Sequence, residues 1–532
     1  MDMGRLMKQE MNSVVEVLDK ATIASIVMIS VIVSLLTLGI PVAAQTLVNL
    51  IAFGKLLQPV LTLSIMVLVL MIALGALNIW QAIIIEVIQQ KLMVRISLNL
   101  TRQFTHLSLD NFSSHHGPEL VNRFFEVVTI NKALSSLLLY GINLSLQLVF
   151  GLLLLLFYHP LFLVFDGFIV LSIILIVFLP YRKGLASAEQ ECTEKHHIGA
   201  WLEELLTNRF LFRFNRYHHY ATQQTDKRLV SFLKARNMHF KQLIKHQIGF
   251  YLLSAIASSL LLGLGGYLVI NNQLSLGQLV AAEIVLGALI YAFKRFSVLL
   301  ENYYDLVASE HKIDVVLNLP TETINSELSE LIIPIKSITL VTKNQELASC
   351  SAENPLIICL NETHKQESFT DFILGFKKNT EVIMYVNETL CHEEYRRCLR
   401  EQTLLLRDKE WFAGSIYDNL RLNQPSFSIQ HLKELLTSFG LIDKIMSQPR
   451  GLKSIIYDWE QVFTELELIQ LMVIRALIAK PQLIIIDGLF DKMATKDIEL
   501  LLGYLATLNE TLLIIITQYP SIIPRSNSLV LS

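Results

Sequence analysis

The stretch ATIASIVMISVIVSLLTLGIPVAAQTLVNLI, which runs from Ala21 to Ile51, contains no Lys, Arg, Asp or Glu. The hydrocarbon core of a bilayer is about 30 Å thick, and a helix needs about 20 predominantly apolar residues to cross it. The stretch exceeds this length, which predicts a membrane-spanning helix that tilts or projects beyond the lipid.

Five further apolar stretches follow, which brings the predicted number of membrane spans to six. They are Leu57–Val87, Ala133–Tyr158, Leu161–Pro180, Ile248–Ile270 and Leu276–Phe293. Glu283 lies inside the last stretch, and we interpret it as a carboxylate at a helix end or facing the bundle, in preference to a group that lines a substrate path. The chain is thus predicted to be a multi-pass integral membrane protein.

The apolar residues are concentrated in one part of the chain. Among 532 residues, 52% are hydrophobic and 17% are charged, against about 25% charged residues in an average soluble domain. The deficit of charge falls in residues 22–300, whereas residues 320–532 have a soluble composition. We therefore predict a membrane domain over residues 1–319, a linker over residues 320–330 and a second domain over residues 331–532. The net charge of −3 gives no indication of a nucleic-acid partner.

Positive residues indicate how the spans are oriented. The connection after the second predicted span contains Lys91, Arg95, Arg102, Arg123 and Lys132, and the connection after the fourth contains twelve Lys and Arg residues. Connections rich in Lys and Arg stay on the cytoplasmic side. We therefore expect both long connections and both termini to be cytoplasmic.

The two long connections also show helical spacing of apolar residues. This spacing extends over Lys91–Leu109 and Ala186–Lys245, and turn-forming residues interrupt it near Asn111–Pro118 and near Asn208–Tyr217. The pattern predicts that the spans continue as helices beyond the membrane and form two hairpins, each with a short segment at its tip.

No metal site is expected. Cys391, His392 and Cys398 do not match the spacing of a zinc module. Adjacent histidines, such as His196 and His197, point to different sides of a helix and make poor chelates, so we expect them to be solvated surface residues.

The C-terminal part alternates short apolar runs with helical patterns. The runs are Leu356–Leu360, Val382–Val386, Thr403–Leu406, Leu483–Asp487 and Leu512–Thr517. Continuous apolar runs bounded by turns are typical of buried parallel strands, and their alternation with helices indicates an α/β domain.

Three segments of this part resemble ABC exporters. RALIAKPQLIIID (Arg475–Asp487) is similar to the end of the signature helix and the Walker B strand, and WFAGSIYDNL (Trp411–Leu420) to the stretch after the Q-loop. GLIDKIMSQPRG (Gly440–Gly451) is similar to the stretch before the signature motif. In the membrane part, Gly117–Arg123 resembles the first coupling helix of that family.

The resemblance implies a six-span helical membrane domain followed by an α/β P-loop-NTPase-like ABC domain that uses ATP and Mg²⁺. It also implies a dimer in the lipid bilayer that works by alternating access. Peptide and type I secretion exporters are the most similar members, which suggests a bacterial inner membrane. The hairpin tips would be coupling helices, near Asn111–Leu120 and Asn208–Tyr217.

The phosphate loop of the family is not preserved. The aligned segment, Leu360–Ser368, lies between the predicted strand Leu356–Leu360 and a predicted helix at Phe369–Gly375. It contains no glycine, although a phosphate loop needs glycines so that backbone N–H groups can surround the phosphates. Gln366 takes the lysine place, with Lys365 one residue earlier. Glu367, followed by Ser368, takes the place of the magnesium-binding hydroxyl, where its carboxylate would repel phosphate.

The other motifs differ from the family in the same direction. Asp487 of the Walker B strand is kept, but Gly488 stands in the place of the catalytic Glu and Gln518 in the place of the switch His. Arg407 replaces the Q-loop Gln. The signature becomes Phe463–Glu467, in which Thr464 keeps a hydroxyl and Glu465 brings a carboxylate.

These residues define a vestigial ATP site without a catalytic residue, so we expect no hydrolysis by this chain alone and no clear anchor for ATP and Mg²⁺. One interpretation is a half-transporter subunit that dimerises with an active ABC subunit or with a second copy. The alternative is a membrane scaffold or regulator that does not pump. An ordinary homodimeric exporter with its motifs elsewhere conflicts with the retained Asp487 and with the order of the flanking segments.

Overall fold

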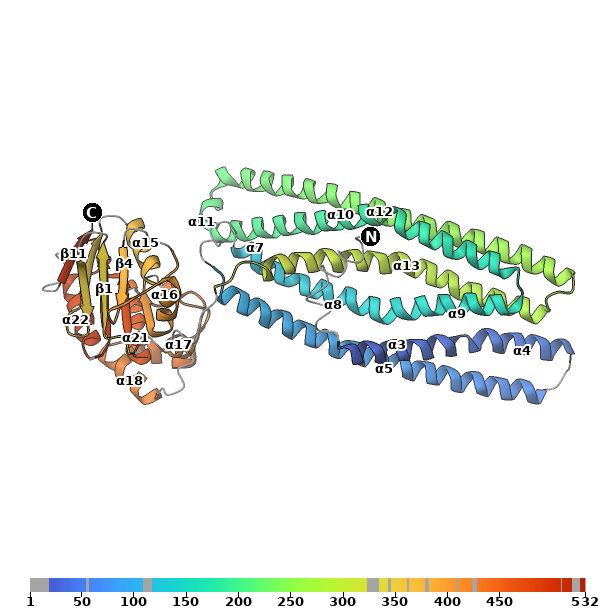
Figure 1. The fold of residues 1–532 in the computed structure, drawn as a ribbon, viewed down its shortest axis with the longest axis horizontal. Helices are drawn as coiled ribbons and strands as arrows, with labels where there is room; N and C mark the ends of the chain where they lie inside the picture. Colours follow the sequence, from blue (N-terminus) through green and yellow to red (C-terminus); the bar gives the residue numbers. More distant parts are fainter. Residues whose placement is uncertain are drawn as a thin grey trace. The chain divides into compact units, whose positions relative to one another are not determined.

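The computed structural model describes residues 19–53, 57–108, 117–322, 334–342, 346–360, 363–377, 382–407, 410–422, 428–508, 510–518 and 527–531. The chain divides into two compact units, of which unit 1 contains residues 1–107 and 111–321 and unit 2 contains residues 108–110 and 322–532. The two units are described separately (Figure 1).

Unit 1 is helical, and its described residues contain six helical segments that are long and apolar enough to cross a membrane, as the sequence predicted. The principal helices are α3 (Lys20–Thr37), α4 (Gly39–Phe53), α5 (Leu57–Thr105), α8 (Glu126–Ser136), α9 (Ile142–Tyr158), α10 (Phe162–Thr207), α12 (Asn215–Ile270) and α13 (Leu276–Leu317). The first span consists of α3 and α4, which are separated at Leu38 just before Gly39 and Pro41. The third span contains a π-helical turn, Leu137–Gly141, between α8 and α9.

The predicted extensions of the spans are confirmed. Helices α5, α10 and α12 continue well past the apolar stretches, and the short helix α11 (Arg209–Phe212) lies between α10 and α12. The other hairpin tip lies mostly outside the described residues, which begin again at α7 (Gly117–Asn122). Helix α13 continues without a break from the sixth predicted span to Leu317, because no Gly or Pro interrupts it after Phe293.

Pro180 lies inside α10 and creates a backbone problem that α12 and α13 solve. Proline has no N–H, so it cannot donate to the carbonyl oxygen of Ile176 one turn earlier. His246 of α12 lies with Nδ1 3.0 Å from that oxygen. Since the carbonyl can only accept, Nδ1 carries the hydrogen, and Nε2 accepts from the hydroxyl of Tyr304 on α13 at 3.0 Å. Three helices are therefore joined at one point.

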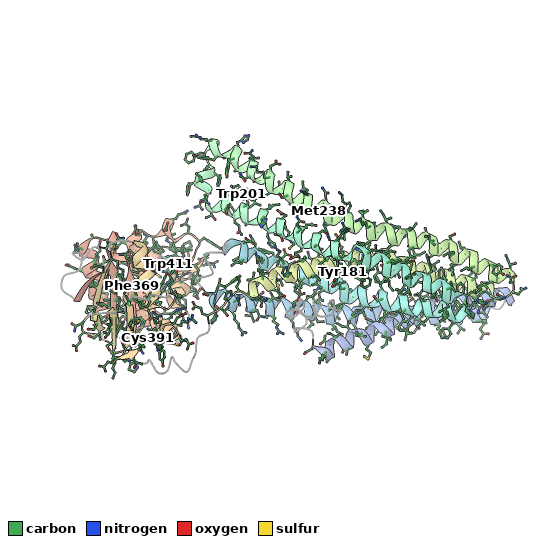
Figure 2. All side chains as sticks on the ribbon, turned by 45° about the horizontal axis from the view of Figure 1, so that its top comes forward. Tyr181, Trp201, Met238, Phe369, Cys391 and Trp411 are labelled. Carbon is green, nitrogen blue, oxygen red and sulfur yellow. The ribbon has the colours of Figure 1, made fainter. Side chains whose placement is uncertain are left out.

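Farther along the same hairpin, Trp201 packs between α10 and α12 (Figure 2). Its indole N–H donates to the hydroxyl of Thr225 at 2.9 Å, and the guanidinium of Arg228 lies 4.4 Å from the ring centroid. These contacts hold the ends of the two helices together close to α11.

Unit 2 contains a parallel sheet and an antiparallel sheet. The parallel sheet has the order β11-β3-β10-β9-β6, with β3 (Leu356–Leu360), β6 (Thr403–Leu406), β9 (Leu483–Asp487), β10 (Leu512–Thr517) and β11 (Asn527–Leu531). The antiparallel sheet has the order β2-β1-β4-β5, with β1 (Ser337–Thr342), β2 (Glu346–Ser351), β4 (Val382–Val386) and β5 (Thr389–Leu390). A two-stranded ribbon joins β7 (Gly414–Ser415) and β8 (Ile455–Ile456).

Helices surround these sheets. They are α15 (Thr363–Ile373), α16 (Glu393–Leu399), α17 (Ile416–Arg421), α18 (Ile429–Ser438), α19 (Ile442–Met446), α20 (Trp459–Val462), α21 (Glu465–Ala479) and α22 (Thr495–Leu505). The parallel sheet separates two apolar cores. Ile484 and Ile486 of β9 face one core, whereas Leu483 and Ile485 face the other. Burial on both faces explains why this strand is apolar at consecutive positions.

Two predictions for this unit need correction. Val382–Val386 was expected to be a parallel strand, but β4 pairs antiparallel with both β1 and β5 and alternates buried with more exposed residues, as a strand covered on one face does. The helix expected at Phe369–Gly375 begins earlier, at Thr363, so that only residues 361 and 362 separate it from β3. The aligned phosphate-loop segment is therefore largely helical.

We predict that Gly184→Ala destabilises unit 1. A Cβ atom at Gly184 would lie 2.6 Å from Cζ of Tyr304, whose side chain is fully buried. The ring must move, which disturbs its hydrogen bond to His246 and costs about 1–3 kcal/mol for overpacking. Thermal unfolding of the full chain in detergent, monitored by the loss of the folded peak in size-exclusion chromatography, should therefore show a lower midpoint temperature.

The matched control is Gly167→Ala on the same helix, where no atom lies within 4 Å of the added Cβ. This change should leave the midpoint unchanged or raise it slightly, because Ala favours a helix by about 1 kcal/mol over Gly. Equal midpoints for the two variants would contradict the role assigned to the contact between Gly184 and Tyr304.

Candidate functional site

The carboxyl ends of the parallel strands bring several of the sequence-predicted site residues together. Asp487 ends β9, Gln518 directly follows β10 and Arg407 directly follows β6. Gln366 comes from α15, the helix that follows β3. Open α/β sheets bind their ligands at this edge.

Arg407 binds two carboxylates at this edge. Its Nε lies 2.7 Å from Oδ2 of Asp487, and Nη1 and Nη2 each lie 3.1 Å from Oδ1 of Asp371 on α15. The side chains of Arg407, Asp487 and Asp371 are 21%, 3% and 13% exposed. Burial by itself would lower the pKa of Arg407, but the two carboxylates raise it above its usual value.

Asp487 has a second internal partner. The hydroxyl of Thr370, which is fully buried on α15, donates to the same Oδ2 atom at 2.8 Å. Asp371 is also shared, since Lys377 lies with Nζ 3.0 Å from its other oxygen. One oxygen of the Asp487 carboxylate is therefore occupied by a guanidinium and a hydroxyl from the same chain.

Gln366 points toward the end of β3. Its side chain is 1% exposed, and Nε2 lies 3.5 Å from the carbonyl oxygen of Leu360. Its Oε1 would lie 3.5 Å from a Cβ atom added to Gly488. Gln366 thus packs against the ends of two strands. Ser368 is half-buried on the same helix, whereas the side chains of Lys365 and Glu367 lie outside the described part of the structure.

Gly488 and Gln518 are positioned through their backbones. Gly488 has φ of 65°, a conformation that suits glycine, and its N–H donates to the carbonyl oxygen of Ile516 at 2.9 Å. The backbone N–H of Gln518 donates to the carboxylate of Asp491, with distances of 3.1 and 3.3 Å to its two oxygens. Thr517 donates its hydroxyl to the same carboxylate.

The signature segment forms a separate arrangement at the N-terminus of α21. Thr464 is the N-cap, and its hydroxyl accepts from the N–H of Glu467, whose carboxylate accepts from the N–H of Thr464 at 2.7 Å. Nζ of Lys444 lies 2.5 Å from Oε2 of Glu467. Burial would raise the pKa of Glu467, but Lys444 and Thr464 together hold it below its usual value. Glu465 follows in the first turn of the helix.

This reciprocal capping has a chemical consequence. The N-terminus of a helix attracts anions because its first N–H groups have no partner within the helix. Here the carboxylate of Glu467 already binds at that end of α21, so the segment supplies its own anion.

Sequence reasoning missed three members of the site, namely Thr370, Asp371 and Asp491. Thr370 and Asp371 lie on α15 beyond the aligned phosphate-loop segment, and Asp491 lies in a short 3₁₀ turn, Leu489–Lys492, after β9. Thr370 lies four residues after Gln366 on the same helix, and Asp491 lies four residues after Asp487, so the spacing from these predicted residues was the available signal. This spacing does not identify Arg407 as the partner of Asp487, because Arg407 lies 80 positions before Asp487.

A family model for the ABC transporter transmembrane region matches residues 21–293, just over half of the 532 residues. The chain belongs to this family. It is similar to the exotoxin translocation ATP-binding protein PaxB of Pasteurella aerogenes, with 24% identity over 280 residues, 49% of this chain and 38% of that protein. It is also similar to the alpha-hemolysin translocation ATP-binding protein HlyB of Escherichia coli O157:H7, with 24% identity over 282 residues, 49% of this chain and 39% of that protein.

A solved structure extends the likeness in fold to nearly the whole chain. The structure of a bacterial Atm1-family ABC exporter with ATP bound matches with a TM-score of 0.82 and 15% identity, covering 97% of this chain and 94% of that one. Apart from residues 108–110, the residues that this family model matches belong to unit 1, which also contains the six long apolar helical segments. The chain is therefore an integral membrane protein of this family.

We predict that Arg407→Ala destabilises unit 2, because it leaves the buried carboxylate of Asp487 without its cation. Loss of one partner of a buried ion pair costs about 3–5 kcal/mol. Urea unfolding, followed by the fluorescence of Trp411 and Trp459 with Trp80 and Trp201 replaced by Phe, should show a lower midpoint.

Two further variants test the cause of this loss. Arg407→Ala combined with Asp487→Asn should recover part of the stability, because no unpaired charge then remains. Lys433→Ala removes an exposed positive charge from the same unit and should have little effect. A loss for Lys433→Ala as large as that for Arg407→Ala would contradict the assignment.

Proposed function

We propose that this chain is a subunit of an ABC-type exporter and that unit 2 is an ABC nucleotide-binding domain that does not hydrolyse ATP. The family match of unit 1 and the fold similarity over 97% of the chain support the exporter architecture. The ion pair between Arg407 and Asp487 carries the second part of the proposal.

Phosphoryl transfer depends on a metal ion and on positive groups around the transferring phosphate. In ABC ATPases, the Walker B carboxylate binds Mg²⁺. In this chain the carboxylate of Asp487 is neutralised by Arg407 at 2.7 Å and accepts a hydrogen bond from Thr370. A metal would have to displace a guanidinium that a second carboxylate, Asp371, also binds.

The remaining positions of the site lack the groups that would stabilise the transition state. Gln366 is neutral and is buried against β3, and Gly488 has no side chain to act as a base. Loss of one group that stabilises developing charge typically costs a factor of about 10² in rate. The combined replacements therefore lead us to propose a pseudo-ATPase in which ATP and Mg²⁺ have no effective anchor.

A chain of this kind needs a partner to drive transport. We propose that residues 1–319 form the membrane domain, residues 320–330 a linker and residues 331–532 the nucleotide-binding domain, and that the chain dimerises with an active ABC subunit. Its termini would face the cytoplasm of a bacterium, with the spans in the inner membrane. The relatives translocate exotoxin and alpha-hemolysin by name, which favours a polypeptide as cargo.

We predict that the purified chain in lipid nanodiscs has no ATP turnover above that of empty nanodiscs. The reason is that Arg407 already binds the carboxylate of Asp487 and that Gly488 and Gln518 stand in the places of the catalytic Glu and the switch His. Phosphate release in the presence of Mg²⁺ measures turnover, and Asp487→Asn provides the matched variant. Turnover that disappears in Asp487→Asn would refute the proposed pseudo-ATPase.

The second candidate function is that of a scaffold or regulator that does not take part in pumping. The capping of α21 by Glu467 favours it, because the composite site of an ABC dimer uses the signature segment of one subunit opposite the phosphate loop of the other. Both elements of this chain are altered, so both composite sites of a dimer would be impaired.

A pull-down of the tagged chain from native membranes, solubilised in mild detergent, should distinguish the two functions. We predict that it recovers an ABC subunit with an intact phosphate loop, and that ATP turnover appears in that complex. A stable complex with a membrane protein of another family, without any ABC subunit, would instead support the scaffold.

A further inference from the structure

A buried cluster in unit 1 contains three groups that commonly bind metals. Glu126 begins α8, and Cys192 and His196 lie on α10 in the segment between Tyr181 and Trp201 (Figure 2). Their exposed fractions are 2%, 7% and 6%. The carboxylate oxygen, the sulfur and the ring nitrogen all lie within 4.8 Å of one another.

The sequence expectation that His196 is a solvated surface residue is wrong. Its neighbour His197 points elsewhere and is half exposed, but Cys192 precedes His196 by four residues and therefore shares its face of the helix. Nε2 of His196 lies 3.0 Å from Oε1 of Glu126. Within the described structure, this buried nitrogen nevertheless makes no hydrogen bond of acceptable geometry.

Glu126 is held in place by a group on a third helix. The hydroxyl of Ser309 on α13 donates to its Oε2 at 2.6 Å, which leaves Oε1 directed toward Cys192 and His196. A hydrogen bond to the second oxygen of a carboxylate orients it for a metal, as outer partners do in many metal sites.

The charge that now balances Glu126 comes from a side chain that can leave. Nζ of Lys195 lies 2.6 Å from Oε1, but the Lys195 side chain is 51% exposed whereas that of Glu126 is 3% exposed. The ammonium group can therefore move away from Oε1 and become fully solvated by water. The carboxylate cannot do so without moving α8.

We propose that Glu126, Cys192 and His196 form a binding site for a divalent transition-metal ion of the zinc type. Sulfur, imidazole nitrogen and one carboxylate oxygen are ligands that zinc accepts, and three protein ligands leave a fourth position for a small molecule such as water. The site is independent of the vestigial nucleotide site, which lies in unit 2.

The two positive charges of such an ion are balanced by its protein ligands. The Cys192 thiol releases its proton to solvent and binds as a thiolate, so that its charge and that of Glu126 offset the two positive charges of the metal. Lys195 then leaves Oε1 and is solvated. The bound ion would tie the start of α8 to the middle of α10, beside Ser309 of α13.

Cobalt(II) is the probe of choice, because a thiolate ligand gives it a charge-transfer absorption and a tetrahedral site gives it strong visible bands. The full chain is purified into nanodiscs, reduced, treated with a chelator, freed of the chelator and titrated with Co²⁺. We expect one equivalent to bind per chain with both spectral features, and Zn²⁺ to displace it.

Matched variants assign the ligands. Cys192→Ser should abolish the charge-transfer absorption, whereas Cys350→Ser, at a buried cysteine of unit 2, should leave it unchanged. Ser309→Ala should weaken Co²⁺ binding by about tenfold through loss of the outer hydrogen bond. Lys195→Gln removes the competing cation and should bind Co²⁺ at least as tightly as the unmodified chain.

The unmodified chain by itself can overturn the proposal. If it elutes as a folded species and shows no thiolate charge-transfer absorption with Co²⁺, the cluster is an ion pair and not a metal site. The same conclusion follows if the absorption persists in a folded Cys192→Ser variant.

Discussion

A backbone carbonyl in an apolar helix must find a partner inside the protein, and the centre of the membrane unit is built around one carbonyl that lacks its usual partner. Pro180 leaves the oxygen of Ile176 without an N–H from its own helix. His246 supplies that donor, Tyr304 completes the chain of hydrogen bonds, and Gly184 leaves room for the Tyr304 ring. Helices α10, α12 and α13 are thereby fixed relative to one another where a proline would otherwise have weakened the first of them.

The buried carboxylates at the edge of the parallel sheet in unit 2 also find their partners inside the protein. Asp487 is 3% exposed there and is neutralised by Arg407, and Asp491 accepts hydrogen bonds from Thr517 and Gln518. At the start of α21, the carboxylate of Glu467 accepts a hydrogen bond from the N–H of the N-cap residue Thr464. The carboxylates at this edge and at the start of α21 are thus satisfied by partners within the chain. This arrangement supports the proposal that unit 2 has no effective anchor for ATP and Mg²⁺.

Asp487 and Glu126 are both buried carboxylates with a positively charged partner, but they differ in whether a metal ion can displace that partner. The guanidinium of Arg407 is bound by Asp487 and Asp371 and is only 21% exposed, so its displacement would leave the buried carboxylate of Asp487 without its cation and remove one of the two cations that bind Asp371. The ammonium of Lys195 belongs to a half-exposed side chain that can return to water, while Cys192 and His196 remain beside Glu126. Displacement by a metal ion is therefore favoured at Glu126 and opposed at Asp487.

The sequence by itself determined the features that depend on local pattern. Residues 21–51 and the other five apolar stretches specify membrane helices, because a helix in lipid satisfies its own backbone. The consecutive apolar residues of Leu483–Asp487 and Leu512–Thr517 specify buried parallel strands. Only the tertiary structure decided the antiparallel pairing of β4, the burial of His196 and the contact between Arg407 and Asp487, which are 80 residues apart. Such pairings depend on which distant surfaces meet when the chain folds, and the spacing of residues within one segment carries no record of that.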